Sequence, residues 1–133
     1  MNNQVTVVIE KTDTGFSAYA KEIDGLTTVG SSLGEVKRNM YEVVNDHLEY
    51  MKECGETAPS ITDLKINFVV DLEQFFGYYN VINKTAFAEY AGINQSLFRQ
   101  YTRGLAPISG KKMKQISQGL HKLADDLHDL TLA

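Results

Sequence analysis

Side chains that can donate hydrogen bonds gather between residues 94 and 103. They are Asn94, Gln95, Ser96, Arg99, Gln100 and Arg103. Amide, hydroxyl and guanidinium groups of this kind can bind both the phosphates and the base edges of a nucleic acid. No acidic residue interrupts the segment, so nothing within it would repel a polyanion. The segment therefore has the chemistry of a nucleic-acid contact.

The charges of the chain are divided unevenly along its length. The chain has a net charge of -4, yet residues 80–122 contain seven lysines and arginines and the single acid Glu89, whereas residues 1–70 have a net charge of -5. A surface that served only solubility would mix both signs, so the basic segment indicates a polyanionic partner. The residues expected in the major groove are Gln95, Ser96, Arg99, Gln100 and Arg103. The residues expected to contact phosphates are Lys84, Thr85 and Lys111 or Lys112.

Two short helices joined at a glycine are predicted to hold these side chains. Asn83 and Asn94 can cap the two helices, and Gly92 stands where the chain must turn through positive φ. The residues predicted to face inward are Phe87, Ala88, Ala91, Ile93, Leu97, Phe98 and Tyr101. This pattern is typical of a helix-turn-helix whose second helix enters DNA. Plain packing of two helices is the alternative interpretation.

The first seventy residues show the period of strands, with one long helix among them. The strands are expected at residues 4–10, 16–23, 26–29 and 64–70, with Asp24-Gly25 closing a tight hairpin. Ser32 and Glu35 form a predicted capping box, and apolar residues then recur every three or four positions as far as Met51. The last strand is expected to turn its apolar residues towards this helix: Leu64, Ile66, Phe68 and Val70.

These elements predict an α+β fold class with two domains. Residues 1–70 would form a β-β-β-α-β layer of one sheet covered by one helix. Residues 71–133 change to a helical period throughout and would form an all-α domain.

Both halves resemble known families. The second half is similar to the repressor-type helix-turn-helix of phage regulators through Phe87-Ala88-Glu89-Tyr90-Ala91-Gly92-Ile93, Arg103-Gly104, Pro107 and Ser109. The first half resembles the N-terminal domain of HicB-type antitoxins through Gly15-Phe16-Ser17-Ala18-Tyr19, Asp24-Gly25, Gly30, Leu33-Gly34-Glu35-Val36 and Asn39. Ile23-Asp24-Gly25-Leu26 stands where that family usually has a Pro-Gly-Cys element.

The resemblance implies an antitoxin that is also a repressor. A partial ribonuclease-H-like layer would bind and occlude a HicA-like ribonuclease toxin, and the helical domain would bind operator DNA of its own operon. The charge of -5 on residues 1–70 would steer a basic toxin towards this layer. The alternative is a stand-alone helix-turn-helix transcriptional regulator whose N-terminal domain mediates assembly or senses a ligand.

Residue patterns for catalysis, metals or cofactors are not found. The acids that could hold metal ions, as in nucleases, are assigned to turns or to outward strand positions. These acids are Glu10, Asp13, Glu22 and Asp24. The single cysteine, Cys54, favours a reducing compartment. We therefore expect a cytoplasmic non-enzyme with no metal site, no cofactor and no membrane segment.

A seam of apolar residues runs along the last predicted helix at alternating spacings of three and four. It consists of Met113, Ile116, Leu120, Leu123, Leu127 and Leu130. The first half of the seam should pack against the domain core, which leaves Leu127 and Leu130 without cover. We expect these two leucines to form the contact of a homodimer, or of a higher even oligomer, with two reading helices about 34 Å apart.

Overall fold

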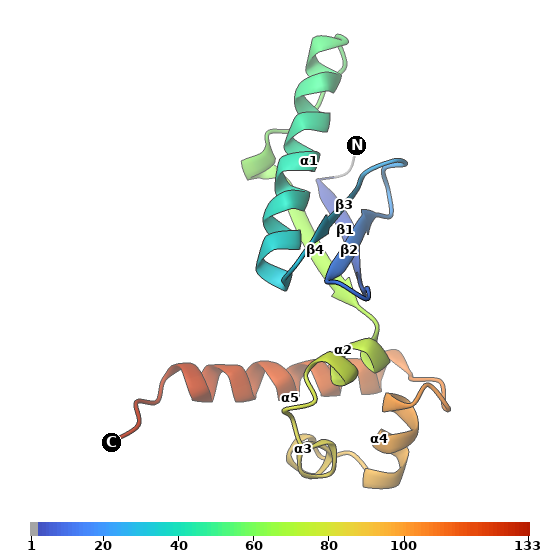
Figure 1. Ribbon diagram of the computed structural model, residues 1–133, viewed down its shortest axis with the longest axis vertical. Helices are drawn as coiled ribbons and strands as arrows, with labels where there is room; N and C mark the ends of the chain where they lie inside the picture. The colour runs from blue at the N-terminus through green and yellow to red at the C-terminus, as the bar shows by residue number, and fades with distance from the viewer. Residues whose placement is uncertain (1–2) are drawn as a thin grey trace. The chain divides into compact units, whose positions relative to one another are not determined.

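The computed structural model describes residues 3–133, which form two compact units. The first unit ends at Gln74 and the second begins at Phe75. Within the described residues there are a four-stranded mixed sheet and five α-helices (Figure 1). The expected α+β class is therefore confirmed. No helix in this part of the chain is long and apolar enough to cross a membrane.

The sheet belongs to the first unit and has the order β3-β2-β1-β4. Its strands are β1 (Gln4–Lys11), β2 (Phe16–Ala20), β3 (Thr27–Gly30) and β4 (Lys65–Val70). β1 pairs antiparallel with β2 and parallel with β4. A parallel pair needs a long crossover, and here α1 (Leu33–Glu53) and the short 3-10 helix η1 (Ile61–Asp63) lie within it. The element order β-β-β-α-β is as predicted.

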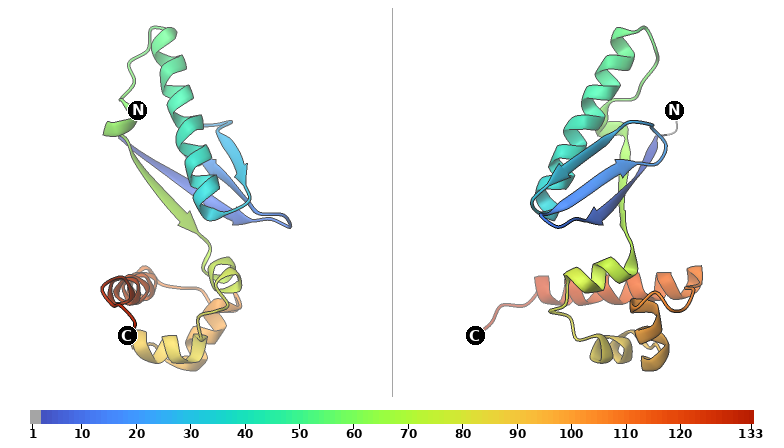
Figure 2. Two further views of the ribbon diagram at one scale, coloured as in Figure 1. Left: turned by 60° about the vertical axis from the view of Figure 1, so that its left-hand side comes forward. Right: turned by 45° about the vertical axis from the view of Figure 1, so that its right-hand side comes forward.

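One face of the sheet is covered by α1 (Figure 2). The alternation of β1 places its apolar side chains on this face, where they are buried together with one stripe of α1. These buried residues are Val5, Val7, Ile9, Val36, Met40, Val44 and Leu48. The stripe repeats every four residues, which keeps it on one side of a helix with 3.6 residues per turn.

The N-terminus of α1 is capped largely as predicted. The Ser32 hydroxyl accepts from the Glu35 N–H at 3.1 Å. The Glu35 carboxylate does not close the predicted capping box with Ser32, but accepts from the Ser31 hydroxyl at 2.7 Å. This bond is the main reason why the pKa of Glu35 lies below its ordinary value.

The predicted hairpin between β2 and β3 is present, since the two strands pair antiparallel, but its turn is longer than the tight turn predicted. β2 ends at Ala20, and residues 21–26 form a loop in which Gly25 has the expected positive φ of 81°. The carboxylate of Glu22 turns back to accept from the Thr6 N–H at 2.8 Å, so Glu22 is a loop residue and not an outward-facing strand residue. Because this bond links residues that are distant in sequence, the local turn signal did not reveal it.

The end of β4 also differs from the prediction. Ile66 and Phe68 are half-buried on the side of α1, but Val70 is 43% exposed. β4 is the last strand of the sheet, so α1 covers it less completely than β1. Val70 is therefore not one of the inward residues that the apolar alternation predicted.

The described helices of the second half are short except for the last. They are α2 (Leu72–Tyr78), which contains the division between the units, α3 (Lys84–Ala91), α4 (Gln95–Thr102) and α5 (Gly110–His128). Three phenylalanines from successive helices meet in the core of the second unit. Phe76 lies with ring centroids 5.7 Å from Phe87 and 5.2 Å from Phe98.

The predicted seam of α5 is interrupted at both ends. Met113 is 39% exposed, although its half of the seam was expected to pack in the core. Leu130 follows the C-cap residue Asp129 and so lies outside the helix. The middle of the seam is covered as predicted, with Ile116 buried and Leu120 and Leu123 half-buried, and buried Gly119 joins this inner side.

Candidate nucleic-acid interface

The connection between α3 and α4 has the local chemistry that the sequence predicted. The Asn83 side chain accepts from the Ala86 N–H at 3.0 Å, and that of Asn94 accepts from the Leu97 N–H at 3.0 Å. Gly92 has φ 74° and ends α3 in the left-handed conformation. Both N-caps and the positive-φ glycine are therefore confirmed.

A glutamine of α5 supports this turn from a distant part of the sequence. The Gln115 Nε2 donates to the carbonyl of Ala91 at 2.8 Å and to that of Gly92 at 3.1 Å. These carbonyls lie at the C-terminal end of α3, where the carbonyl groups have no N–H donor within the helix. Sequence reasoning missed Gln115 because no local signal connects a residue of one helix to the end of another.

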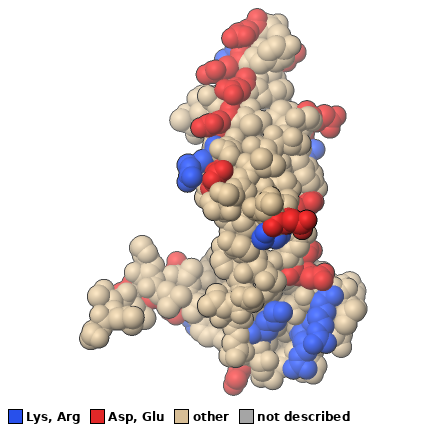
Figure 3. All heavy atoms as spheres, in the orientation of Figure 1, with Lys and Arg blue, Asp and Glu red and all other residues tan. Residues whose placement is uncertain are grey.

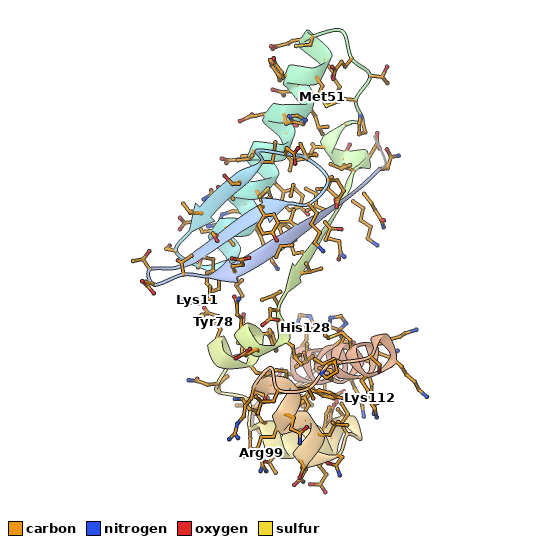
Figure 4. All side chains as sticks on the ribbon, turned by 90° about the vertical axis from the view of Figure 1, so that its right-hand side faces the viewer. Lys11, Met51, Tyr78, Arg99, Lys112 and His128 are labelled. Carbon is orange, nitrogen blue, oxygen red and sulfur yellow. The ribbon has the colours of Figure 1, made fainter. Side chains whose placement is uncertain are left out.

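The position of α4 is set by its buried side. Phe98 and Tyr101 are buried, and the Phe98 ring lies 5.6 Å from the ring of Phe87 on α3. The opposite side of α4 is exposed, and Figure 4 shows Arg99 extending from it. The exposed residues are those predicted to read bases: Gln95, Ser96, Arg99, Gln100 and Arg103.

A hollow of about 190 Å³ lies between the start of α3 and the exposed side of α4. It is lined by Lys84, Thr85, Gln95, Phe98, Arg99, Thr102 and Arg103. Five of these seven residues were predicted as nucleic-acid contacts, and no acid is among them. Figure 3 shows basic side chains gathered on this side of the second unit. The structure thus brings together the start of one helix and the face of the next.

Two residues of the hollow were not predicted as nucleic-acid contacts, although Phe98 was predicted to face inward. Phe98 and Thr102 are buried and form its floor. The Thr102 hydroxyl donates to the Arg99 carbonyl at 3.0 Å, which ties the side chain to its own helix. Both support α4, which the sequence pattern indicated for Phe98 and only the packing of the helices reveals for Thr102.

The remaining predicted contacts stand outside the hollow. Three of them lie on or beside α4 but do not line the hollow: Asn94, Ser96 and Gln100. The Asn94 Oδ1 already accepts the capping hydrogen bond from the Leu97 N–H. Lys111 and Lys112 belong to the first turn of α5, after the N-cap Ser109. Figure 4 shows Lys112 at this helix and not among the residues of α4.

Acidic residues stand in the first turns of α1 and α2 but not in those of α3, α4 and α5. Glu35 and Glu73 provide an acid in the first turn of α1 and of α2, where the helix dipole favours negative charge. The first turns of α3, α4 and α5 contain no acid. Lysines stand at the starts of α3 and α5 instead, which costs helix stability unless an anion is bound nearby.

The last turns of α5 carry the residues predicted for self-association. Leu127 is 64% exposed and Leu130 is 69% exposed, so both lack cover within the described chain. Nearby, the Tyr90 hydroxyl of α3 donates to Asp126 at 3.3 Å, and the Lys122 ammonium lies 5.0 Å from the Tyr90 ring centre. Partial burial and then the Asp126 charge raise the pKa of Tyr90.

Other features of the described residues offer little chemistry. No group of three or more His, Cys, Asp or Glu is placed to hold a metal ion in residues 3–133. Cys54 is the exposed C-cap of α1. Comparison of the chain with protein-family models, with curated proteins and with solved structures returns no match.

Proposed function

We propose that residues 75–133 are a helix-turn-helix DNA-binding domain, with α4 as the helix that enters the major groove. The observation that supports this best is the acid-free hollow between α3 and α4. At the start of α3 it has two side chains that can donate hydrogen bonds to phosphates, Lys84 and Thr85. On α4 and its C-cap it has three side chains able to reach base edges: Gln95, Arg99 and Arg103.

The absence of acids from three helix starts supports the same proposal. Main-chain N–H groups and lysines at the starts of α3 and α5 can both bind phosphate oxygens. Lys84, Lys111 and Lys112 would then gain a counter-ion at the place where they otherwise weaken their helices.

Binding to double-stranded DNA tests the proposal. A preferred site would be selected from random duplexes with the full-length protein, and affinity measured by fluorescence anisotropy over a range of salt concentrations. Arg99→Ala should cost about 1–3 kcal/mol on the selected site and little on random DNA, because a guanine contact is lost. Lys84→Ala should weaken both DNAs alike and reduce the salt slope by about one.

Lys52→Ala serves as the control, since Lys52 lies at the end of α1 in the other unit. If the full-length protein shows no salt-dependent affinity for any duplex, the proposed function is wrong. If Arg99→Ala weakens selected and random DNA equally, Arg99 contacts phosphate and does not read a base.

We further propose that the first unit is a non-catalytic partner-binding domain of partial ribonuclease-H-like type, and that its partner is a basic, HicA-like ribonuclease toxin in the cytoplasm. Its acidic charge and its resemblance to HicB-type antitoxins support this role. The decisive experiment co-expresses the full-length protein with any short basic reading frame adjacent to its gene. Rescue of growth and of cellular RNA is expected; toxicity that persists despite soluble expression of both proteins would contradict the role.

A homodimer would place two reading helices on one DNA site. The exposure of Leu127 and Leu130 supports the prediction that they form the contact between copies. Sedimentation of the Leu127→Asp, Leu130→Asp variant should show weaker association than the wild type. An association constant equal to that of the wild type would show that these leucines are not in the contact.

A further inference from the structure

The two edges of the sheet differ in how they are covered. At the β3 edge, the carbonyl of Val29 accepts from the Asn39 side chain of α1 at 2.8 Å. An alanine Cβ at Gly30 would lie 2.5 Å from the Val36 nitrogen, so α1 lies directly against this edge. The β3 edge is thus protected by the helix, as exposed edges of natural sheets commonly are.

The β4 edge has no such cover among the described residues. The Lys65 N–H donates to the Asn3 carbonyl at 2.8 Å, so the main-chain groups of Lys65 point towards β1. Since main-chain direction alternates along a strand, those of Asn67 and Val69 also point to β1. The main-chain groups of Ile66, Phe68 and Val70 consequently point outwards, away from the sheet.

The side chains at this edge are apolar and only partly covered. Phe68 is half-buried, with its ring 5.8 Å from that of Tyr41 and the Lys37 ammonium 5.5 Å from its centre. Tyr41 and Val70 are more than two-fifths exposed. The strand contains no proline, and its one charge is Lys65 at the start.

We propose that the β4 edge pairs antiparallel with the β4 edge of a second copy of this chain, which joins two sheets into one. A two-fold axis at Phe68 sets Phe68 opposite its own copy and Ile66 opposite Val70. Each outward-pointing residue then meets another outward-pointing one, as an antiparallel hydrogen-bonded pair requires.

The same register also matches the charges. It places Lys65 of each copy opposite Asp71 of the other, so the strand pairing includes two opposite-charge contacts. Shifting the axis by one position, to Asn67, instead sets Lys65 opposite Val69 and leaves it without an opposite charge. Charge complementarity therefore favours Phe68 over Asn67 as the centre, and in this register the β4 edge complements a second copy of itself.

The residues of this interface are not among the proposed DNA contacts, so the test measures dimer formation. The full-length Leu127→Asp, Leu130→Asp variant is the background, because it removes the leucine contact between copies. Sedimentation should still show dimers at micromolar concentration. In this background Val70→Pro removes one outward N–H per copy, and Val70→Thr keeps it. The proline variant should raise the dimer dissociation constant about 30-fold, and the threonine variant should change it less than three-fold.

A charge test does not depend on the strand tolerating proline. Lys65→Glu should weaken the dimer about ten-fold, because it places like charges opposite each other. Adding Asp71→Asn should restore part of the affinity, since asparagine can keep the N-terminal cap that the Asp71 carboxylate provides to the Gln74 N–H. Lys52→Glu is the matched charge control and should have no effect.

Three results would overturn the proposal. They are a purely monomeric background variant, equal losses for Val70→Pro and Val70→Thr, or a Lys65→Glu change that leaves the association of the background variant unaltered. Failure of the DNA-binding proposal is recognised separately, because the Arg99→Ala variant should lose selective DNA affinity while its assembly is unchanged.

Discussion

Replacing Gly119 by alanine should destabilise the unit formed by residues 75–133. Gly119 is buried in α5, on the side that faces α3. An added Cβ would lie 3.1 Å from the Ala91 Cβ and 3.2 Å from the Phe87 Cζ. The Ala91 Cβ is fixed to its main chain and cannot rotate away. The two helices must therefore separate to make room, in an interior that is otherwise close-packed.

Two opposing terms determine the size of the effect. Alanine is the better helix former by about 1 kcal/mol. Overfilling a packed site typically costs about 1–3 kcal/mol. The net loss of stability should be about 1 kcal/mol, within a range of about 0–2 kcal/mol. Gly77→Ala in α2 is the matched control, because its Cβ would meet nothing within 4 Å. That variant should gain about 0.5–1 kcal/mol.

Hydrogen exchange, followed by mass spectrometry on peptides of α3 and α5, measures the stability of this unit directly. A loss of about 1 kcal/mol speeds exchange of the best-protected amides about five-fold, whereas Gly77→Ala should slow it. The reasoning is refuted if Gly119→Ala slows exchange as much as the control does. That result would mean that α3 and α5 have room for a methyl group.

Three further predictions follow from single contacts. Asn94→Ala should cost about 1 kcal/mol and speed exchange in α4, because the Leu97 N–H loses its acceptor, whereas Asn94→Ser should keep most of the cap. The pKa of Glu35 is lowered, so its bond to Ser31 adds stability above pH 4.5 that is lost as the pH falls through the lower folded-state value. Denaturation at several acidic pH values should therefore show a smaller loss of stability for Ser31→Ala than for the wild type. The raised pKa of Tyr90 adds stability below pH 10 that is lost as the pH rises through the higher folded-state value, so alkaline denaturation should show a smaller loss for Tyr90→Phe. The pKa of Tyr79 is also raised, so absorbance titration should contain two late tyrosines in the wild type and one in Tyr90→Phe.

Long-range features of the fold were beyond the reach of sequence patterns. The register that pairs Val7 with Phe68 and the turning back of Glu22 to Thr6 join residues far apart in the chain. Apolar alternation in β4 predicted that Val70 would be covered, but cover depends on where α1 crosses the sheet. The same holds for Met113, whose helical period was right and whose exposure depended on neighbouring helices.

The sequence by itself determined the caps, the glycine turn and the helix and strand periods, because each depends on main-chain chemistry within a few residues. Asn83, Gly92 and Asn94 do locally what their side chains, or the lack of one, allow. Only the tertiary structure decided that Lys84 and Arg99 line one hollow and that Gln115 holds the end of α3. It alone also decided which sheet edge α1 protects. The physical reason is that these features depend on how helices and strands pack against one another, and packing joins residues that local sequence patterns cannot relate.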